Sequence, residues 1–284
     1  MVEPRDLVGR WNELWVADRG ALVAELYHPD VEVVSLRGEH PPIVGHDALS
    51  AALEPVGRRI AFPTAVATGV VVAGSSVSVE QRLGGREIDD PGPMAAPALR
   101  WWTLDDEGMI THELVWSDWS ARRSTIPDDM APTVPPAADG DQLSRAWYDS
   151  FVGRLAETWA WEPELSVRSF FADDCLLDAP GSAADAIVGA DALVAVVDAQ
   201  AERLVPRRRE LRPLRVAGER SAVATAFVVE ATDRELGGRR AAAGALVGAL
   251  DASQRLRTAR IYFDWSTARD PAELRDVLEV PAAG

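Results

Sequence analysis

The sequence predicts an α+β fold that occurs twice in tandem, with helices at the start of each copy and a mostly antiparallel sheet after them. Residues 7–74 can be laid on residues 151–218 at a constant offset of 144, with 18 identities in 68 positions. In both copies, apolar residues recur first at helical spacing and then at strand spacing. Residues 124–140 contain four prolines and no apolar periodicity, which indicates a linker between domains 1–123 and 141–284.

Each copy is expected to begin with two helices. The apolar residues at helical spacing are Leu7, Trp11, Leu14 and Trp15 in the first copy, and Trp147, Phe151, Leu155 and Trp159 in the second. A second short helix ends at residues 25–30 and 169–174, where proline and polar residues terminate it. A strand pair then follows, at residues 31–36 and 43–44, or 175–178 and 187–188.

The third helix begins at Asp47 or Asp191, because an acid in the first turn is favoured by the positive end of the helix dipole. From there the chain is expected to form strands to its end, which in the second copy are residues 222–232, 240–250 and 256–266. Two more matches extend the repeat at offsets of 153 and 146. They join residues 83–86 to 236–239 and residues 118–120 to 264–266.

Composition excludes several classes of protein. A formal net charge of −16 argues against nucleic-acid binding. The single cysteine, Cys175, excludes an internal disulfide, and the absence of lysine excludes Schiff-base and P-loop chemistry. The four histidines have no metal-ligand spacing, so we expect no metal and no other cofactor. With no apolar run of membrane-spanning length and no signal-peptide pattern, a soluble cytoplasmic protein is expected.

The order of elements, with Phe-Ala-Asp-Asp at 171–174 and Val-Gly-x-Asp-Ala-Leu at 188–193, resembles the nuclear transport factor 2-like (SnoaL-like) superfamily. The resemblance implies that each domain is a cone-shaped, curved sheet wrapped on three helices, with an apolar cavity at its wide end. Members of the superfamily include polyketide cyclases, ketosteroid isomerase, epoxide hydrolases, dehydratases and proteins that only bind or assemble. Catalytic members place one to three acids in the cavity, where a desolvated carboxyl can exchange protons near neutrality.

A first pair of candidate acids is Asp118 and Asp264, which occupy the same point of the last strand in the two copies. Their segments resemble the end strand of SnoaL-type cyclases, in which an aspartate acts as acid and base. Counting by twos places Trp116 with Asp118 and Tyr262 with Asp264 on one face. Asp264 is therefore a catalytic candidate and the other three are candidates for substrate binding. The alternative is an acid at a strand end that bonds a neighbouring loop or arginine.

A second pair, Asp178 and Glu210, resembles the acid pair of polyether epoxide hydrolases. In that family the aspartate directly precedes a proline, whereas here Ala179 holds that position. A shift of one residue turns a strand side chain to the opposite face, and only a bulge would return Asp178 to the cavity. Glu210 is expected on the same face as Val216.

The N-terminal copy has Val34 and Val66 at the aligned positions and therefore no acid pair. The C-terminal copy is thus expected to hold the active cavity, with the N-terminal copy as its structural partner in an intramolecular pseudo-dimer that could oligomerise further. Trp159 and Arg154 are candidates for lining that cavity. An ion pair of Arg154 with Glu157, three residues further along its helix, explains the arginine equally well.

The predicted function is a cofactor-free acid/base cyclase or epoxide hydrolase that acts on an apolar polyketide-type intermediate in natural-product biosynthesis. Asp178 and Glu210 would share the acid and base roles, with Asp264 as the alternative base. A non-catalytic ligand-binding or scaffold protein is the first alternative, favoured by the loss of acids in the first copy. The second is an isomerase or dehydratase like ketosteroid isomerase, against which the missing aspartate before Pro180 counts.

Overall fold

The computed structural model describes residues 3–88, 93–117, 138–179, 186–205 and 209–278. The chain divides into two compact units, residues 1–35 with 40–137 and residues 36–39 with 138–284. Each unit contains one copy of the repeat. No helix among these residues is long and apolar enough to cross a membrane.

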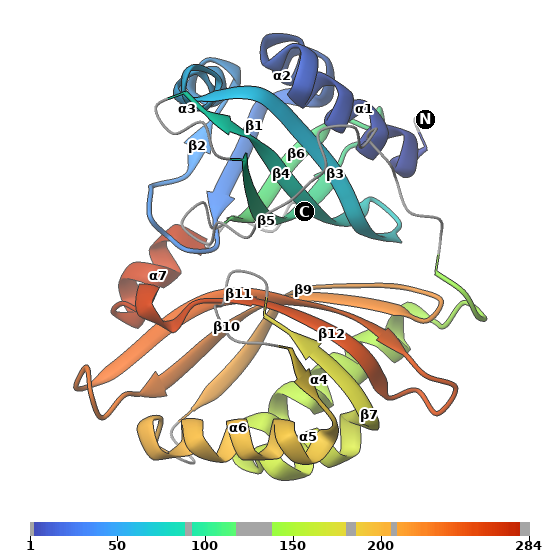
Figure 1. Ribbon diagram of the computed structural model, residues 1–284, viewed down its shortest axis with the longest axis vertical. Helices are drawn as coiled ribbons and strands as arrows, with labels where there is room; N and C mark the ends of the chain where they lie inside the picture. The colour runs from blue at the N-terminus through green and yellow to red at the C-terminus, as the bar shows by residue number, and fades with distance from the viewer. Residues whose placement is uncertain (1–2, 89–92, 118–137, 180–185, 206–208, 279–284) are drawn as a thin grey trace. The chain divides into compact units, whose positions relative to one another are not determined.

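The N-terminal domain is a six-stranded sheet with helices on one face (Figure 1). Its strands lie in the order β2-β1-β6-β5-β4-β3, and neighbours are antiparallel except for the parallel pair β1 and β6. Its elements are α1 (Pro4–Ala17), α2 (Arg19–Leu26), β1 (Tyr27–Ser35), β2 (Ile43–Val44), α3 (His46–Arg59), β3 (Ile60–Ala73), β4 (Ser76–Glu87), β5 (Pro93–Leu104) and β6 (Ile110–Ser117).

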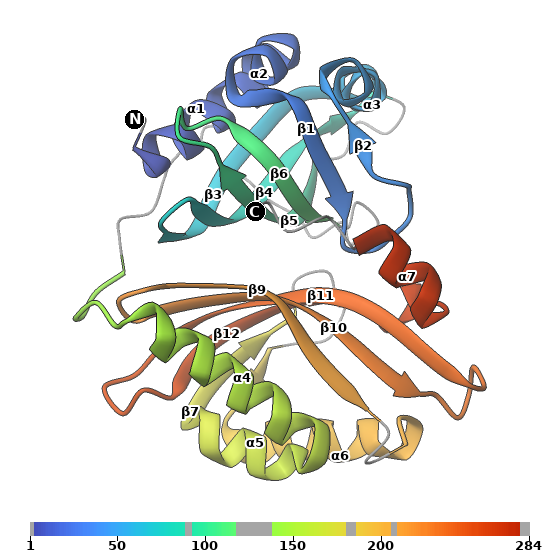
Figure 2. The same ribbon diagram turned by 180° about the vertical axis from the view of Figure 1, so that it is seen from behind.

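The C-terminal domain repeats this architecture with strand order β8-β7-β12-β11-β10-β9. Its helices α4 to α6 cover one face of the sheet, as both views show (Figures 1 and 2). The predicted α+β class with two tandem cone-shaped domains is confirmed. The elements are α4 (Arg145–Trp161), α5 (Pro163–Phe170), β7 (Phe171–Asp178), β8 (Ile187–Val188), α6 (Ala190–Arg203), β9 (Glu210–Glu219), β10 (Ala222–Thr232), β11 (Arg239–Leu250) and β12 (Leu256–Phe263).

The chain does not continue as strands to its end. Strand β12 stops at Phe263, and a 3₁₀ turn, Trp265–Thr267, follows because the Asp264 side chain accepts a hydrogen bond from the amide of Ser266. A further helix, α7 (Pro271–Leu278), begins with a proline, which is favoured in the first turn because its missing N–H costs no helix hydrogen bond. Helix α7 buries Leu274 and Leu278 and contacts β11.

The structural correspondence between the copies differs from the sequence alignment beyond the third helix. Helices α3 and α6 still correspond at an offset of 144, but strands β5 and β11 and strands β6 and β12 correspond at 146. Two extra residues therefore precede β9 in the C-terminal copy. Glu210 pairs with Glu230 as Thr64 pairs with Gly84, so the position equivalent to Glu210 is Thr64 and not Val66.

The match of residues 83–86 with 236–239 is likewise a resemblance of sequence alone. Gly84 and Gly85 lie within β4, paired with β3 and β5. Gly237 and Gly238 lie in the turn between β10 and β11, where both have positive φ angles of 69° and 79°. Such a backbone favours glycine because a Cβ would clash.

Each domain has its own core between helices and sheet. In the N-terminal domain α1 presents Leu7, Trp11, Leu14 and Trp15 to the inner faces of the strands. In the C-terminal domain α4 presents Phe151, Val152 and Leu155 to them. A large side chain buried in this way contributes about 1.5–3 kcal/mol, which orients each helix on its sheet. The helix-facing side of each sheet is called its inner face below.

Candidate active site

Glu210 lies on the outer face of the C-terminal sheet. Val216 packs in the core as expected, but a β-bulge leaves Leu214 unpaired, since Arg215 pairs with Ala226 and Pro213 with Phe227. The extra residue reverses the alternation. Leu211 therefore points inward, and Glu210, which is 57% exposed, pairs with Arg239 at 3.3 Å.

Asp178 ends β7 on the outer face as well, because its neighbour Leu177 packs in the core. The register is regular over this part of the strand, where Asp178 pairs with Arg260, so no bulge returns it inward. Strand β7 is four strand positions from β9, which is about 19 Å along the sheet. The structure therefore does not bring Asp178 and Glu210 together.

Asp264 lies directly after β12 and caps the 3₁₀ turn. Its Oδ1 atom accepts hydrogen bonds from the amide and the hydroxyl of Ser266, at 2.9 and 2.6 Å. This is the alternative that the sequence left open, an acid at a strand end that bonds a neighbouring loop. Its counterpart Asp118 lies outside the described residues.

The two aromatic residues expected beside these acids also lie on outer faces. Tyr262 pairs with Ala245, whereas the neighbouring pair Ile261 and Leu246 packs in the core. Trp116 pairs with Leu99, and the inward positions of its strand are Glu113 and Val115. Both side chains are buried but neither faces the helices.

Trp159 and Arg154, both on α4, have different environments. Trp159 packs against the core, and the guanidinium of Arg209 lies 5.0 Å from the centroid of its ring. Arg154 is exposed and hydrogen-bonds within its own helix to the Ser150 carbonyl. Arg154 therefore does not line the inner face.

The structure instead places a buried polar network inside the N-terminal domain. Glu113 of β6 accepts hydrogen bonds from the hydroxyl of Tyr27, at 2.7 Å, and from Nη1 of Arg100. Nε of Arg100 donates to Gln81 at 2.9 Å, and Gln81 donates to Asn12 at 2.7 Å. Every member is buried, with Arg100 the most exposed at 8%.

The direction of each hydrogen bond in this chain is fixed by chemistry. Arginine has donors only, so Gln81 must accept from Arg100 through its oxygen and donate through its nitrogen. Asn12 then accepts through Oδ1, and its Nδ2 group is left as a donor with no partner. The indole nitrogen of Trp102, also fully buried, is a second donor without an acceptor.

Tryptophan side chains surround the charged part of the network. The rings of Trp11 and Trp15 stack at 5.1 Å, and the guanidinium of Arg100 lies 4.3 Å from the Trp11 centroid. The Trp11 indole also donates to the Tyr27 hydroxyl at 2.9 Å. Burial, followed by the nearby charge of Glu113, raises the pKa of Tyr27 well above its usual value, so this phenol stays a proton donor at neutral pH.

Every polar member of the network has an apolar counterpart in the C-terminal domain. The helix and first-strand positions correspond at an offset of 144 and the later strands at 146. The counterparts of Asn12, Tyr27, Gln81, Arg100 and Glu113 are Ala156, Phe171, Phe227, Leu246 and Ala259. The two copies therefore differ in the polarity of their interiors. The buried polar residues lie in the N-terminal domain, whereas the acids selected from the sequence lie in the C-terminal domain.

Sequence reasoning missed this site because it compared acids at aligned positions only. One signal was present: Gln81 and Arg100 interrupt rows of apolar residues at alternate positions of their strands, and Glu113 lies two residues before Val115. A polar residue at an inward strand position requires a buried partner. Only the pairing of β4, β5 and β6 shows that these three are partners of one another.

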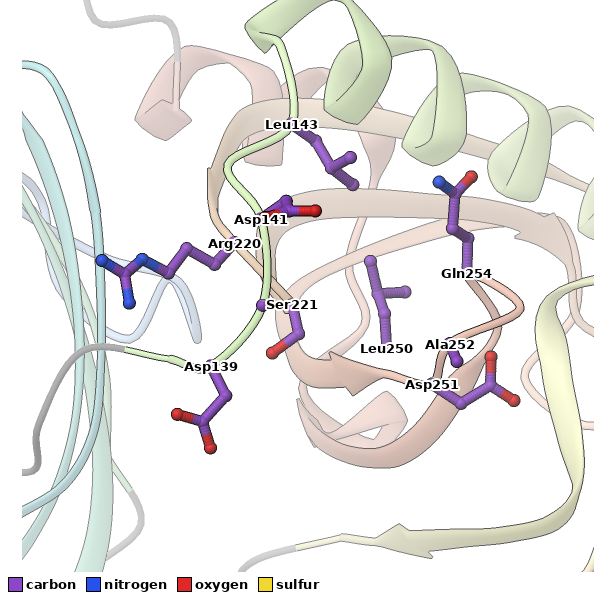
Figure 3. A pocket seen from close by; sticks show the side chains of 10 residues that line it. Asp139, Asp141, Leu143, Arg220, Ser221, Leu250, Asp251, Ala252 and Gln254 are labelled. Atoms are coloured by element: carbon purple, nitrogen blue, oxygen red, sulfur yellow. The ribbon is translucent and has the colours of Figure 1, made fainter.

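A hollow in the C-terminal domain lies between the segment before α4 and two hairpin turns (Figure 3). Its side chains do not converge, since Arg220 points away from Asp251 and Gln254. Asp251 is already used by its own turn, where Oδ1 accepts from the amides of Ser253 and Arg255. We therefore interpret this hollow as a junction of turns and not as a binding site.

No group of three or more histidine, cysteine or acidic side chains in the described part of the chain is placed to hold a metal ion. His28, His46 and His112 make local contacts, and Nε2 of His46 lies 2.7 Å from the Tyr27 carbonyl.

Residues 8–113 match the family model of the SnoaL-like domain. No curated protein matches the chain. Among solved structures, it is similar to a hypothetical protein with a ketosteroid isomerase-like fold from Catenulispora acidiphila, in complex with trimethylamine (22% identity, TM-score 0.38, 45% of this chain and 98% of that one). It is also similar to IdmH from Streptomyces antibioticus, a proposed polyketide cyclase (20% identity, TM-score 0.37, 41% of this chain and 93% of that one). A third similar structure is a proposed SnoaL-like polyketide cyclase from Jannaschia sp. CCS1 (18% identity, TM-score 0.37, 42% of this chain and 87% of that one). Structural likeness at these values carries no argument about activity.

A curved sheet wrapped on three helices, with polar groups on its inner face, defines a domain of the nuclear transport factor 2-like class. Residues 8–113 form a SnoaL-like domain of that class. The N-terminal copy carries the family match, and the C-terminal copy repeats the strand order.

Proposed function

We propose that this protein is a cofactor-free acid/base enzyme of the cyclase or isomerase type, acting on an apolar small molecule inside its N-terminal domain. The observation that carries the proposal is the contrast between the copies at Glu113 and its partners. The C-terminal domain has the same strand order with apolar residues at all five positions. The fold therefore does not require the network.

Retaining a buried ion pair without a structural need is costly. A buried pair is often no more stabilising than apolar residues of similar volume, because both ions lose their hydration. Arg100 and Glu113 are both buried in a core rich in tryptophan. A catalytic role would explain why one copy keeps them, as functional sites are where folds depart from their most stable sequence.

In the proposed reaction Glu113 is the base. Its two oxygens have about four lone-pair sites, of which Tyr27 and Arg100 occupy two. A remaining lone pair would take a proton from a carbon beside a carbonyl, or from an attacking hydroxyl. The electrons of the broken bond would enter the substrate, and Glu113 would return the proton at another atom as the product forms.

The unpartnered donors Asn12 Nδ2 and Trp102 Nε1 would stabilise the oxygen on which negative charge develops. Arg100 would position Glu113, and Gln81 would position Arg100 and Asn12. A polyketide-type intermediate in natural-product biosynthesis is the substrate that we propose for this reaction. Epoxide opening by the same residues is the alternative chemistry.

In this proposal the C-terminal copy is the structural partner in a pseudo-dimer. Asp178, Glu210 and Asp264 have no part in the reaction, because two lie on an outer face and the third caps a turn.

The test is proton exchange on probe ketones. The full chain is incubated in D₂O with apolar bicyclic ketones such as 2-tetralone, and exchange at the carbon beside the carbonyl is followed by NMR, with hydrolysis of aryl epoxides as a second assay. Glu113→Gln should lower any enzymatic rate by about 10²-fold or more, the usual effect of losing a general base. Glu210→Gln and Asp264→Asn are the matched controls. Loss of activity in a control with full activity in Glu113→Gln would reject the assignment, and inactivity on every probe would favour the binding or scaffold alternative.

A further inference from the structure

Arg19, the first residue of α2, has an unusual environment in the N-terminal domain. Its guanidinium carbon lies 4.7 Å from the centroid of the Trp15 ring. Its Nε and Nη2 atoms are buried and have no hydrogen-bond partner. Desolvation by burial lowers the pKa of this arginine, because the guanidinium is partly dehydrated.

The nearby carboxylates are engaged elsewhere. Asp18 caps α2, with Oδ1 accepting from the amides of Gly20 and Ala21 at 2.9 and 3.0 Å. Glu54 accepts a hydrogen bond from Arg58 at 2.9 Å. A charge left unpaired in a partly apolar setting is destabilising, so Arg19 calls for an explanation beyond packing.

Arg19 lines a groove between α2 and α3, together with Ser50, Leu53, Gly57 and Arg58. The guanidinium lies directly against α3, since a Cβ added at Gly57 would be 3.0 Å from its Nη1 atom. Nε and Nη2 are buried atoms without a partner, whereas Nη1 is not among such atoms. It can therefore meet a ligand in the groove.

Arg19 connects the groove to the tryptophans beside the buried network. Trp15, which carries Arg19 on its ring, stacks on Trp11, and Trp11 carries Arg100. Two guanidinium groups thus contact one stacked indole pair. A ligand bound at Arg19 would therefore contact a guanidinium that itself stacks on this indole pair.

The C-terminal domain provides an independent parallel. Trp159 is the counterpart of Trp15, and it also carries a guanidinium, that of Arg209 at 5.0 Å. Arg209 is buried, its Nη1 has no partner, and desolvation lowers its pKa. Arg209 nevertheless comes from the residue before β9, and the counterpart of Arg19 is Pro163. Nε of Arg209 donates to the Ala160 carbonyl at 3.3 Å. The two copies therefore place a partly buried guanidinium on the equivalent indole from different points of the sequence, which indicates that the guanidinium itself is needed.

We propose that Arg19, held on the ring of Trp15, binds the carboxylate of a flat apolar ligand in the α2–α3 groove, so that the substrate class is an apolar carboxylate. The accessible Nη1 atom of Arg19 would donate a charge-assisted hydrogen bond to the carboxylate, and the stacking of the guanidinium on an indole fixes its plane. The identification of this ligand as the substrate rests on the proposed function. The binding site itself does not.

The experiment is calorimetric titration of the full chain with 2-naphthoate and with its uncharged methyl ester. Wild type should bind the carboxylate at least tenfold more tightly than the ester. Arg19→Met, which keeps the apolar stem and removes the charge, should reduce the affinity for 2-naphthoate to that for the ester. Arg58→Met is the matched control, because Arg58 lines the same groove but is paired with Glu54, and it should bind as wild type does.

Two further measurements keep the result interpretable. Arg19→Met should raise the Tm in the absence of ligand, because an unpaired charge is removed, so weaker binding could not be ascribed to unfolding. Gly57→Ala, which retains the charge but crowds Nη1, should weaken 2-naphthoate binding several-fold.

Equal 2-naphthoate affinity in wild type and Arg19→Met would overturn the proposal, as would equal affinity of wild type for acid and ester. Loss of binding in Arg209→Met with none in Arg19→Met would assign the anion to the other copy and also overturn it. A failed catalytic assay with intact Arg19-dependent binding would thus reject the proposed reaction and not this site.

Discussion

Arg100 and Glu113 form an ion pair across a diagonal of the N-terminal sheet, because the register partner of Glu113 is Trp102 while that of Arg100 is Val115. All four side chains share the inner face. The diagonal places the guanidinium between the carboxylate and the Trp11 ring. Both charges are therefore held by partners on several elements, and removing one leaves the other buried.

The pair makes a prediction about stability. Glu113→Gln should lower the free energy of unfolding by about 3–5 kcal/mol, the usual cost of leaving a buried charge without its partner. Urea unfolding followed by circular dichroism measures it. The double variant Arg100→Leu with Glu113→Ala copies the residues of the C-terminal domain and should recover most of the loss. If the double variant is less stable than the single one, the network is a structural necessity and the functional interpretation loses its basis.

Tyr27 predicts a loss of stability in alkali. Its pKa is raised in the folded state by burial first and by Glu113 second, so above about pH 10 the unfolded chain releases a proton that the folded chain retains. Stability should be unaffected below pH 10 and should fall as the pH rises above it. Tyr27→Phe should cost about 1–3 kcal/mol at pH 7, because Trp11 and Glu113 each lose a partner, and should show a smaller alkaline decline. An unchanged decline, measured from the Tm at pH 7 and pH 10.5, would contradict this account.

Asp233 should make the protein less stable in acid, whereas Tyr27 does so in alkali. Burial acts to raise its pKa, but hydrogen bonds from the amides of Leu236 and Glu235, the Trp265 indole and Arg203 outweigh it and lower the pKa from 3.8 to about 2. A lowered pKa contributes stability that is complete above pH 4 and is lost as the pH falls through about 2.

The shift corresponds to about 2 kcal/mol. Asp233→Asn should therefore lose about that much at pH 7 and should show a flatter acid limb between pH 4 and 2. Parallel acid limbs in wild type and variant, from urea midpoints at each pH, would show that Asp233 does not titrate in this range.

Gly218 of β9 should not tolerate a side chain. A Cβ there would lie 2.2 Å from the ring of Tyr148, which is anchored by its hydroxyl bond to the Arg220 carbonyl. Gly218→Ala should cost roughly 1–3 kcal/mol by overpacking. Gly153→Ala is the control, because that glycine is exposed in α4 with open space beside it and should gain about 0.5–1 kcal/mol. Similar Tm changes in the two variants would be inconsistent with the contact.

The candidate site was the least predictable part of the molecule. The sequence-based choice of Glu210 depended on counting alternate residues from Val216, and one bulge at Leu214 reversed the count. Asp178 lies on the outer face, as the shift of one residue relative to Pro180 predicts in the absence of a bulge. Asp264 caps the turn after β12, which is the alternative role that its sequence position allowed.

The sequence by itself determined the duplication, the α+β class and the order of helices and strands up to Asp264, because these follow from local periodicity and from identities at fixed spacing. Only the tertiary structure decided which copy has a polar interior. Asn12, Tyr27, Gln81, Arg100 and Glu113 lie on five different elements, and strand pairing rather than sequence distance brings them together. The physical reason is that the face of a strand residue depends on register and bulges, which involve the neighbouring strand as well as the residue's own segment.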